Sequence, residues 1–119
     1  MRRALALLAI LFLGSQAAQA VQLEEKWHGA GYTQEGSCPQ FDIFISVVAD
    51  KIQGKAVLLE EAYKIEGDLG KDGAFVGQVE YFSIAFVELK GDIGASSGRG
   101  QWRTFKGPKC AGTFDVTKL

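Results

Sequence analysis

The residues that could carry out chemistry in this chain of 119 residues are few. His28 is the single histidine, and Cys38 and Cys110 are the only cysteines. A serine or cysteine nucleophile needs a base beside it, most often a histidine, so one histidine leaves little from which to build such a site. Glu60 and Glu61 form the best carboxylate pair, but adjacent residues in a strand or turn diverge, whereas a glycosidase needs converging carboxylates. We therefore predict that the protein is not an enzyme.

Metal and cofactor sites leave recognisable spacings in a sequence. Here no group of His, Cys, Asp and Glu is spaced like the ligands of a zinc or calcium site. No glycine-rich phosphate loop leads into a helix. We predict no metal and no cofactor.

Two tryptophans form the first candidate ligand-binding site. Side chains two positions apart lie on one face of a β-strand, so Trp27 in the segment 27–31 and Trp102 in the segment 98–102 each share a face with two glycines. The glycines leave room beside the indoles, which could line a small cavity of the kind that eight-stranded barrels hold. The alternative is that both rings simply fill the interior.

A flexible segment, 94–100, forms the second candidate site. The hydroxyls of Ser96 and Ser97 and the guanidinium of Arg99 suit an anion or a partner's carboxylate, although a plain hairpin connection has the same composition. The wider stretch from 93 to 114 has no acidic residue, which indicates either a solvated basic edge or an anion site at a rim. Its basic residues are Arg99, Arg103, Lys106 and Lys109.

The first twenty residues predict export. A basic start, an apolar run from Ala4 to Leu13 and the A-x-A sequence Ala18-Gln19-Ala20 are typical of a secretory signal peptide, and the run is short for a membrane anchor. We expect residues 1–20 to be removed and residues 21–119 to form one periplasmic or secreted domain. In an oxidising compartment, two cysteines in a small domain favour a disulfide between Cys38 and Cys110 over a reactive or metal-binding pair.

The charge of the expected mature chain limits its partners. Without Arg2 and Arg3, eleven Lys and Arg remain against fourteen Asp and Glu. A net negative charge disfavours nucleic acid and anionic membrane as partners, and we expect no stable membrane insertion after signal cleavage.

The elements that must hold these residues are short strands. Six times an apolar residue is followed two positions later by glycine and two positions after that by a small or apolar residue, which is typical of strongly bent strands. The pattern predicts an all-β, eight-stranded antiparallel up-and-down barrel, in which a disulfide would join the end of strand one to the start of strand eight. A β-sandwich is the alternative. The expected strands span 26–33, 41–48, 52–59, 62–69, 74–81, 84–90, 98–105 and 111–117.

Alternation also assigns the strand faces. In the second strand Phe41, Ile43, Ile45 and Val47 are expected to point inward. Apolar residues are left on outward positions, and they would form a protein-contact face if neither candidate site binds a ligand. These residues are Phe44, Val48 and Phe105.

The tryptophan-glycine opening, the hairpin at 50–54 and the closing segment 110–114 resemble those of small exported bacterial proteins with a glycine-rich β-meander. In outline the chain is also similar to avidin-like barrels and to periplasmic lysozyme inhibitors. The resemblance implies a disulfide-containing barrel and transfers no residue roles.

From these observations we expect a non-catalytic binding protein of the bacterial envelope. It would recognise a small ligand inside the barrel through Trp27 and Trp102, or a partner at the rim through Ser96, Ser97, Arg99 and Arg103. The alternative is an inhibitor of a hydrolase such as lysozyme, with the segment 96–99 as the inserting element.

Overall fold

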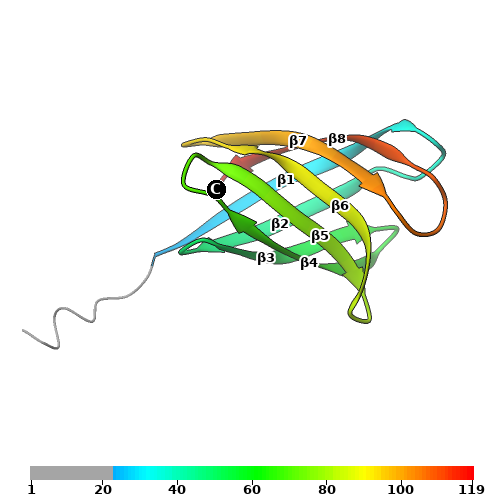
Figure 1. The fold of residues 1–119 in the computed structure, drawn as a ribbon, viewed down its shortest axis with the longest axis horizontal. Helices are drawn as coiled ribbons and strands as arrows, with labels where there is room; N and C mark the ends of the chain where they lie inside the picture. The colour runs from blue at the N-terminus through cyan, green and yellow to red at the C-terminus, as the bar shows by residue number, and fades with distance from the viewer. Residues whose placement is uncertain (1–22) are drawn as a thin grey trace, which may run out of the picture.

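Eight antiparallel strands close into a barrel in the computed structural model, which describes residues 23–119 (Figure 1). Each strand pairs with the next, and the last pairs with the first, so the barrel prediction is confirmed and the sandwich alternative is wrong. The predicted signal peptide lies outside the described residues. The strands are β1 (Glu24–Glu35), β2 (Phe41–Val48), β3 (Lys51–Leu58), β4 (Glu61–Leu69), β5 (Ala74–Tyr81), β6 (Ile84–Ile93), β7 (Ser97–Thr104) and β8 (Ala111–Lys118).

Two strands are longer than predicted by more than one residue. β6 continues through Gly91 to Ile93, because Gly91 lies opposite Gly100 of β7 and the two glycine backbones pack closely there. β1 extends at both ends because Glu24 pairs with β2 and Glu35 pairs with β8 beyond a bulge. Glycine inside a strand therefore marks close backbone contact here and does not end the strand.

The two ends of the barrel differ. One end, which we call the disulfide end, carries the β1–β2, β3–β4, β5–β6 and β7–β8 connections, and the β5–β6 hairpin projects there (Figure 1). The predicted disulfide is present: Cys38 and Cys110, 72 residues apart, have Cα atoms 6.1 Å from each other. It joins the segment after β1 to the residue before β8, which are the two strands that close the barrel.

The interior is packed by aromatic rings that lie over glycines. A Cβ atom on Gly100 would lie 2.6 Å from the Phe114 ring, and one on Gly112 would lie 2.9 Å from the Trp102 indole nitrogen. The glycines thus provide the volume that the rings occupy, in agreement with the close packing of protein interiors. The predicted inward residues of β2 are all buried, whereas Asp42 between them is exposed.

Candidate functional site

Trp27 and Trp102 are both inside the barrel, as the alternation predicted. Their exposed fractions are 2% and 3%. Trp102 lies opposite Gly112, which lies opposite Thr33, and Thr33 is six residues after Trp27 on β1. At about 3.3 Å per strand residue, this register separates the two indoles by roughly 20 Å along the barrel wall. A ligand site between the two rings stays a prediction.

The two indoles also differ in their polar contacts. The Trp102 indole N–H lies 3.2 Å from the carbonyl oxygen of Tyr32 and 3.1 Å from that of Thr113, and the ring meets Phe41 edge-on at 5.3 Å. The buried Trp27 indole nitrogen has no hydrogen-bond partner within the described part of the chain. Trp102 is thus fixed by the barrel's own backbone and fills the interior.

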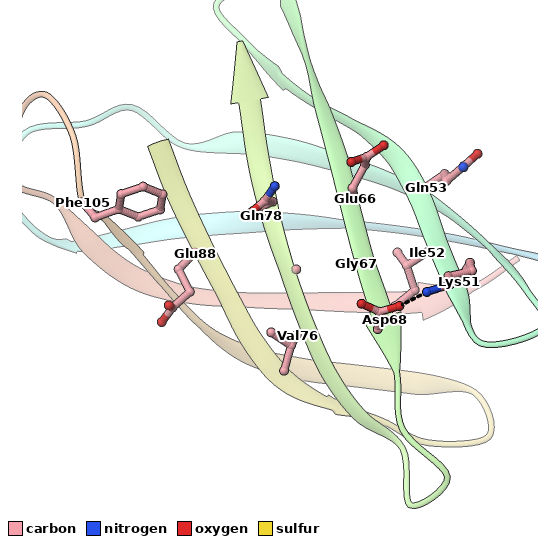
Figure 2. A pocket seen from close by; sticks show the side chains of 11 residues that line it. Lys51, Ile52, Gln53, Glu66, Gly67, Asp68, Val76, Gln78, Glu88 and Phe105 are labelled. Carbon is pink, nitrogen blue, oxygen red and sulfur yellow. Dashed lines mark hydrogen bonds and ion pairs between the residues drawn. The ribbon is translucent and has the colours of Figure 1, made fainter. Parts of the chain in front are cut away.

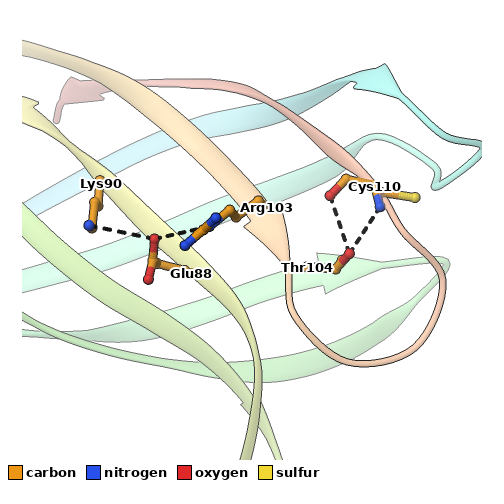
Figure 3. Close-up of polar contacts among 5 residues, drawn as sticks. All are labelled: Glu88, Lys90, Arg103, Thr104 and Cys110. Carbon is orange, nitrogen blue, oxygen red and sulfur yellow. Dashed lines mark hydrogen bonds and ion pairs between the residues drawn. The ribbon is translucent and has the colours of Figure 1, made fainter.

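Acidic residues of the neighbouring strands lie beside the basic residues of β7. Arg99 lies between Asp92 of β6 and Asp115 of β8, and Arg103 lies opposite Glu88. The Arg103 Nε atom is 3.3 Å from the Glu88 carboxylate, which also lies 3.7 Å from the Lys90 ammonium (Figure 3). Cross-strand acids therefore offset the positive charge on which the predicted anion site depended.

The serine segment lies at the end of the barrel opposite the disulfide. Ser96 is in the β6–β7 turn, and Ser97 begins β7. The backbone oxygen of Ser97 accepts a hydrogen bond from Gly94 at 2.8 Å, and that of Ser96 accepts one from Lys118 at 2.9 Å. These bonds tie the segment to the barrel, so it is a short connection and does not project as an inserting loop would.

A groove of about 570 Å³ runs over the outer wall of β3, β4 and β5 and reaches Glu88 and Phe105 (Figure 2). Its floor is formed where Gly67 lies opposite Gly77. Along it, Lys51 contacts Asp68 at 2.6 Å, and Glu66, on the same wall, contacts Lys64 at 2.7 Å.

These ion pairs shift the pKa values of two side chains in the groove. The hydrogen bond from Lys64 lowers the pKa of Glu66, and the bond to Asp68 raises the pKa of Lys51. Both shifts stabilise the charged forms, whereas a general acid needs a carboxyl whose pKa is raised toward neutrality. The side chains are well exposed, so the pairs contribute little to stability.

Aromatic rings gather instead at the disulfide end, over β4, β5 and β6. We call Tyr63, Tyr81, Phe82 and Phe86 the aromatic rim. Tyr63 lies 5.6 Å from Phe86 and 5.3 Å from Tyr81, and Tyr81 lies 4.4 Å from Phe82. Tyr63 and Phe86 pack against the core, whereas Phe82 is 82% exposed. The rim thus connects the barrel interior to a projecting ring.

A bulge in the β5–β6 ladder explains how these rings come together. The register shifts between Val79 and Glu80, so that Val79 lies opposite Val87 while Glu80 lies opposite Ala85 and Phe86 is the extra residue. Bulges are common at barrel rims, where they redirect side chains. The signal in the sequence was the segment 81–87, which is apolar on both faces, but period-two alternation alone could not place it.

Two hairpin turns at this end hold apolar residues in a strained backbone conformation. Leu59 and Glu60 have φ angles of 49° and 71°, and Phe82 and Ser83 have φ angles of 50° and 66°. Two-residue hairpin turns with positive φ favour Asn and Gly, and a bulky residue there is an outlier. Leu59 is 78% exposed, so neither apolar side chain gains burial from its strained position. Such strain is found where a side chain serves function.

The three apolar residues predicted to point outward lie in different surroundings. The Phe44 ring stacks on His28 at 4.6 Å, and the Lys55 ammonium lies 5.5 Å from its centre. Val48 is half-buried. Phe105 is 53% exposed at the disulfide end, and its backbone N–H donates to Phe86 at 3.0 Å. Of the three, Phe105 alone adjoins the aromatic rim.

Among residues 23–119, His, Cys, Asp and Glu form no group of three or more that could hold a metal ion. No helix in that same range has the length and apolar character that a membrane span requires. Comparison of the chain with protein-family models, with curated proteins and with solved structures finds no match.

Proposed function

We propose that this chain is an exported, non-catalytic binding protein of the bacterial envelope that recognises a protein partner at the disulfide end of its barrel. The observation that carries the proposal is the display of Leu59 and Phe82 on two neighbouring turns at this end. About four-fifths of each side chain is exposed. Leu23 and Leu119, which are equally exposed, are the first and last residues that the structure describes. Exposed apolar residues that gather in one place are typical of protein-contact sites, and aromatic residues carry much of the energy there.

The packing of the interior supports recognition at the rim over a ligand inside the barrel. The interior volume beside the glycines is occupied by Phe75, Phe114 and Trp102. The disulfide is consistent with an oxidising compartment, as export would require. Inhibition of a hydrolase is one way in which such a rim could act. The segment 96–99, which was the expected inserting element of an inhibitor, lies at the other end of the barrel.

Site-specific photo-crosslinking tests the proposal. A benzoylphenylalanine in place of Phe82 is expected to form a discrete protein adduct in the cells that export the chain. The matched control carries the same group in place of Val76, which is 53% exposed on the outer wall of β5. An identical adduct from position 76, or no adduct from position 82, would contradict recognition at this end.

A further inference from the structure

Phe82 has the geometry of an anchor that enters a pocket. It occupies the apex of the projecting β5–β6 hairpin, and its ring lies 4.4 Å from Tyr81 at an interplanar angle of 64°. Tyr81 in turn contacts Tyr63, which packs against the core. A ring supported in this way loses little conformational freedom on binding, which is the property of a pre-organised anchor.

The border of this anchor is acidic. Glu60 is in the neighbouring β3–β4 turn and Glu61 begins β4, and both are exposed. Glu80, just before the hairpin tip, is buried and accepts a hydrogen bond from Gln78 at 2.8 Å, so it is not part of this border. The Tyr63 hydroxyl donates to Glu61 at 2.8 Å, which raises the pKa of Tyr63 and links this carboxylate to the rim. Lys64, the base on the adjoining strand, is engaged by Glu66 at 2.7 Å.

Basic residues of the disulfide end lie on a different loop from Glu60 and Glu61. The basic residues of this end, Lys106 and Lys109, lie on the β7–β8 loop beside Phe105. That loop is held to the barrel by bonds between Thr104 and Cys110, including one of 2.9 Å from the Cys110 N–H to the Thr104 hydroxyl (Figure 3). The carboxylates nearest the anchor on the neighbouring hairpin, Glu60 and Glu61, thus lie on the side of the anchor away from Lys106 and Lys109.

On the basis of the proposed function, we infer that the partner is a protein with an apolar pocket bordered by Lys or Arg, and that Phe82 enters this pocket. The cations of the partner face Glu60 and Glu61 across the β3–β4 turn. Opposite charges around an apolar centre accelerate association and reject wrong partners. An anionic lipid surface fits this rim less well, because it would be repelled by the same carboxylates.

The test uses a library of random peptides displayed on phage, selected on the oxidised exported protein. The enriched peptides are then synthesised. We expect an apolar or aromatic centre with Lys or Arg beside it. Phe82→Ser should weaken the binding of such a peptide by about 30-fold or more, as for an interface hot spot. Because Phe82 is exposed, this variant should keep the tryptophan emission of the wild type.

Charge variants separate the inference from the proposed function. Glu60→Gln with Glu61→Gln should weaken the selected peptides several-fold and reduce the salt dependence of binding. Two acids near the opposite end provide the matched control: Glu24→Gln with Asp50→Asn should change neither quantity. Peptides that need Phe82 but have neutral or acidic flanks, or that ignore the Glu60 and Glu61 changes, would overturn the inference and leave recognition at this end standing.

Three other results would overturn the inference. Selected peptides that bind Phe82→Ser as tightly as the wild type would overturn both the inference and the proposed function. Co-sedimentation with phosphatidylglycerol vesicles that is lost in Phe82→Ser would identify a membrane as the partner and refute a protein pocket. A dimer in light scattering that dissociates in the same variant would identify a second copy of the chain as the occupant.

Discussion

Changing Phe82 to Asn together with Ser83 to Gly is expected to make the barrel more stable while it removes the proposed anchor. Both residues have positive φ angles, 50° and 66°. A non-glycine residue in this region costs about 1–3 kcal/mol, whereas Asn and Gly adopt it readily. With the lower value at each position, the gain is about 2 kcal/mol. Loss of the ring contact with Tyr81 offsets about 0.5–1.5 kcal/mol of it, which leaves a net gain of about 1 kcal/mol.

This gain corresponds to a rise in Tm of about 4–8 °C for a domain of this size. Chemical denaturation followed by tryptophan fluorescence measures the free energy of unfolding directly. Leu59→Asn with Glu60→Gly should behave similarly, because that turn has the same positive φ angles. Val76→Asn, on a regular strand, should give no gain. If the turn variants unfold as readily as the wild type or more readily, Leu59 and Phe82 are not strained, and the argument from strain to function fails.

Further predictions concern the barrel itself. Replacing Cys38 and Cys110 by Ser should lower the free energy of unfolding by about 4 kcal/mol, measured by denaturation, since the disulfide closes a loop of 72 residues. Trp102→Phe should destabilise the barrel more than Trp27→Phe in the same assay, because only the Trp102 indole N–H donates hydrogen bonds; equal losses would contradict the assigned contacts. Gly54→Ala should cost about 1–3 kcal/mol, because its Cβ would overlap the backbone oxygen of Phe44 and lie 2.7 Å from the Ile45 Cα atom. An unchanged free energy of unfolding would show that the β2 backbone shifts to admit the methyl group.

The sequence predicted the barrel well because its signals are local. Alternation in β2 placed Phe41 and Ile43 inward, and glycine spacing marked the bent walls. The candidate site depended on information that is not local. The acids beside Arg99 and Arg103 come from neighbouring strands, so that only the register reveals them. The turn at Phe82 was harder to assign, because a phenylalanine disfavours the positive φ that it adopts there.

The closure of β1 against β8 has a consequence for folding. Seven of the eight strand pairings join consecutive strands, whereas this one brings Trp27 opposite Lys118 and must overcome the loop entropy of nearly the whole chain. Until it forms, β1 and β8 are free edges, each with a row of unpaired backbone groups that another chain could extend. The covalent link between the segments that follow β1 and precede β8 holds these two edges near each other. A bond formed before the seam closes would therefore shorten the time for which these two edges are open to another chain.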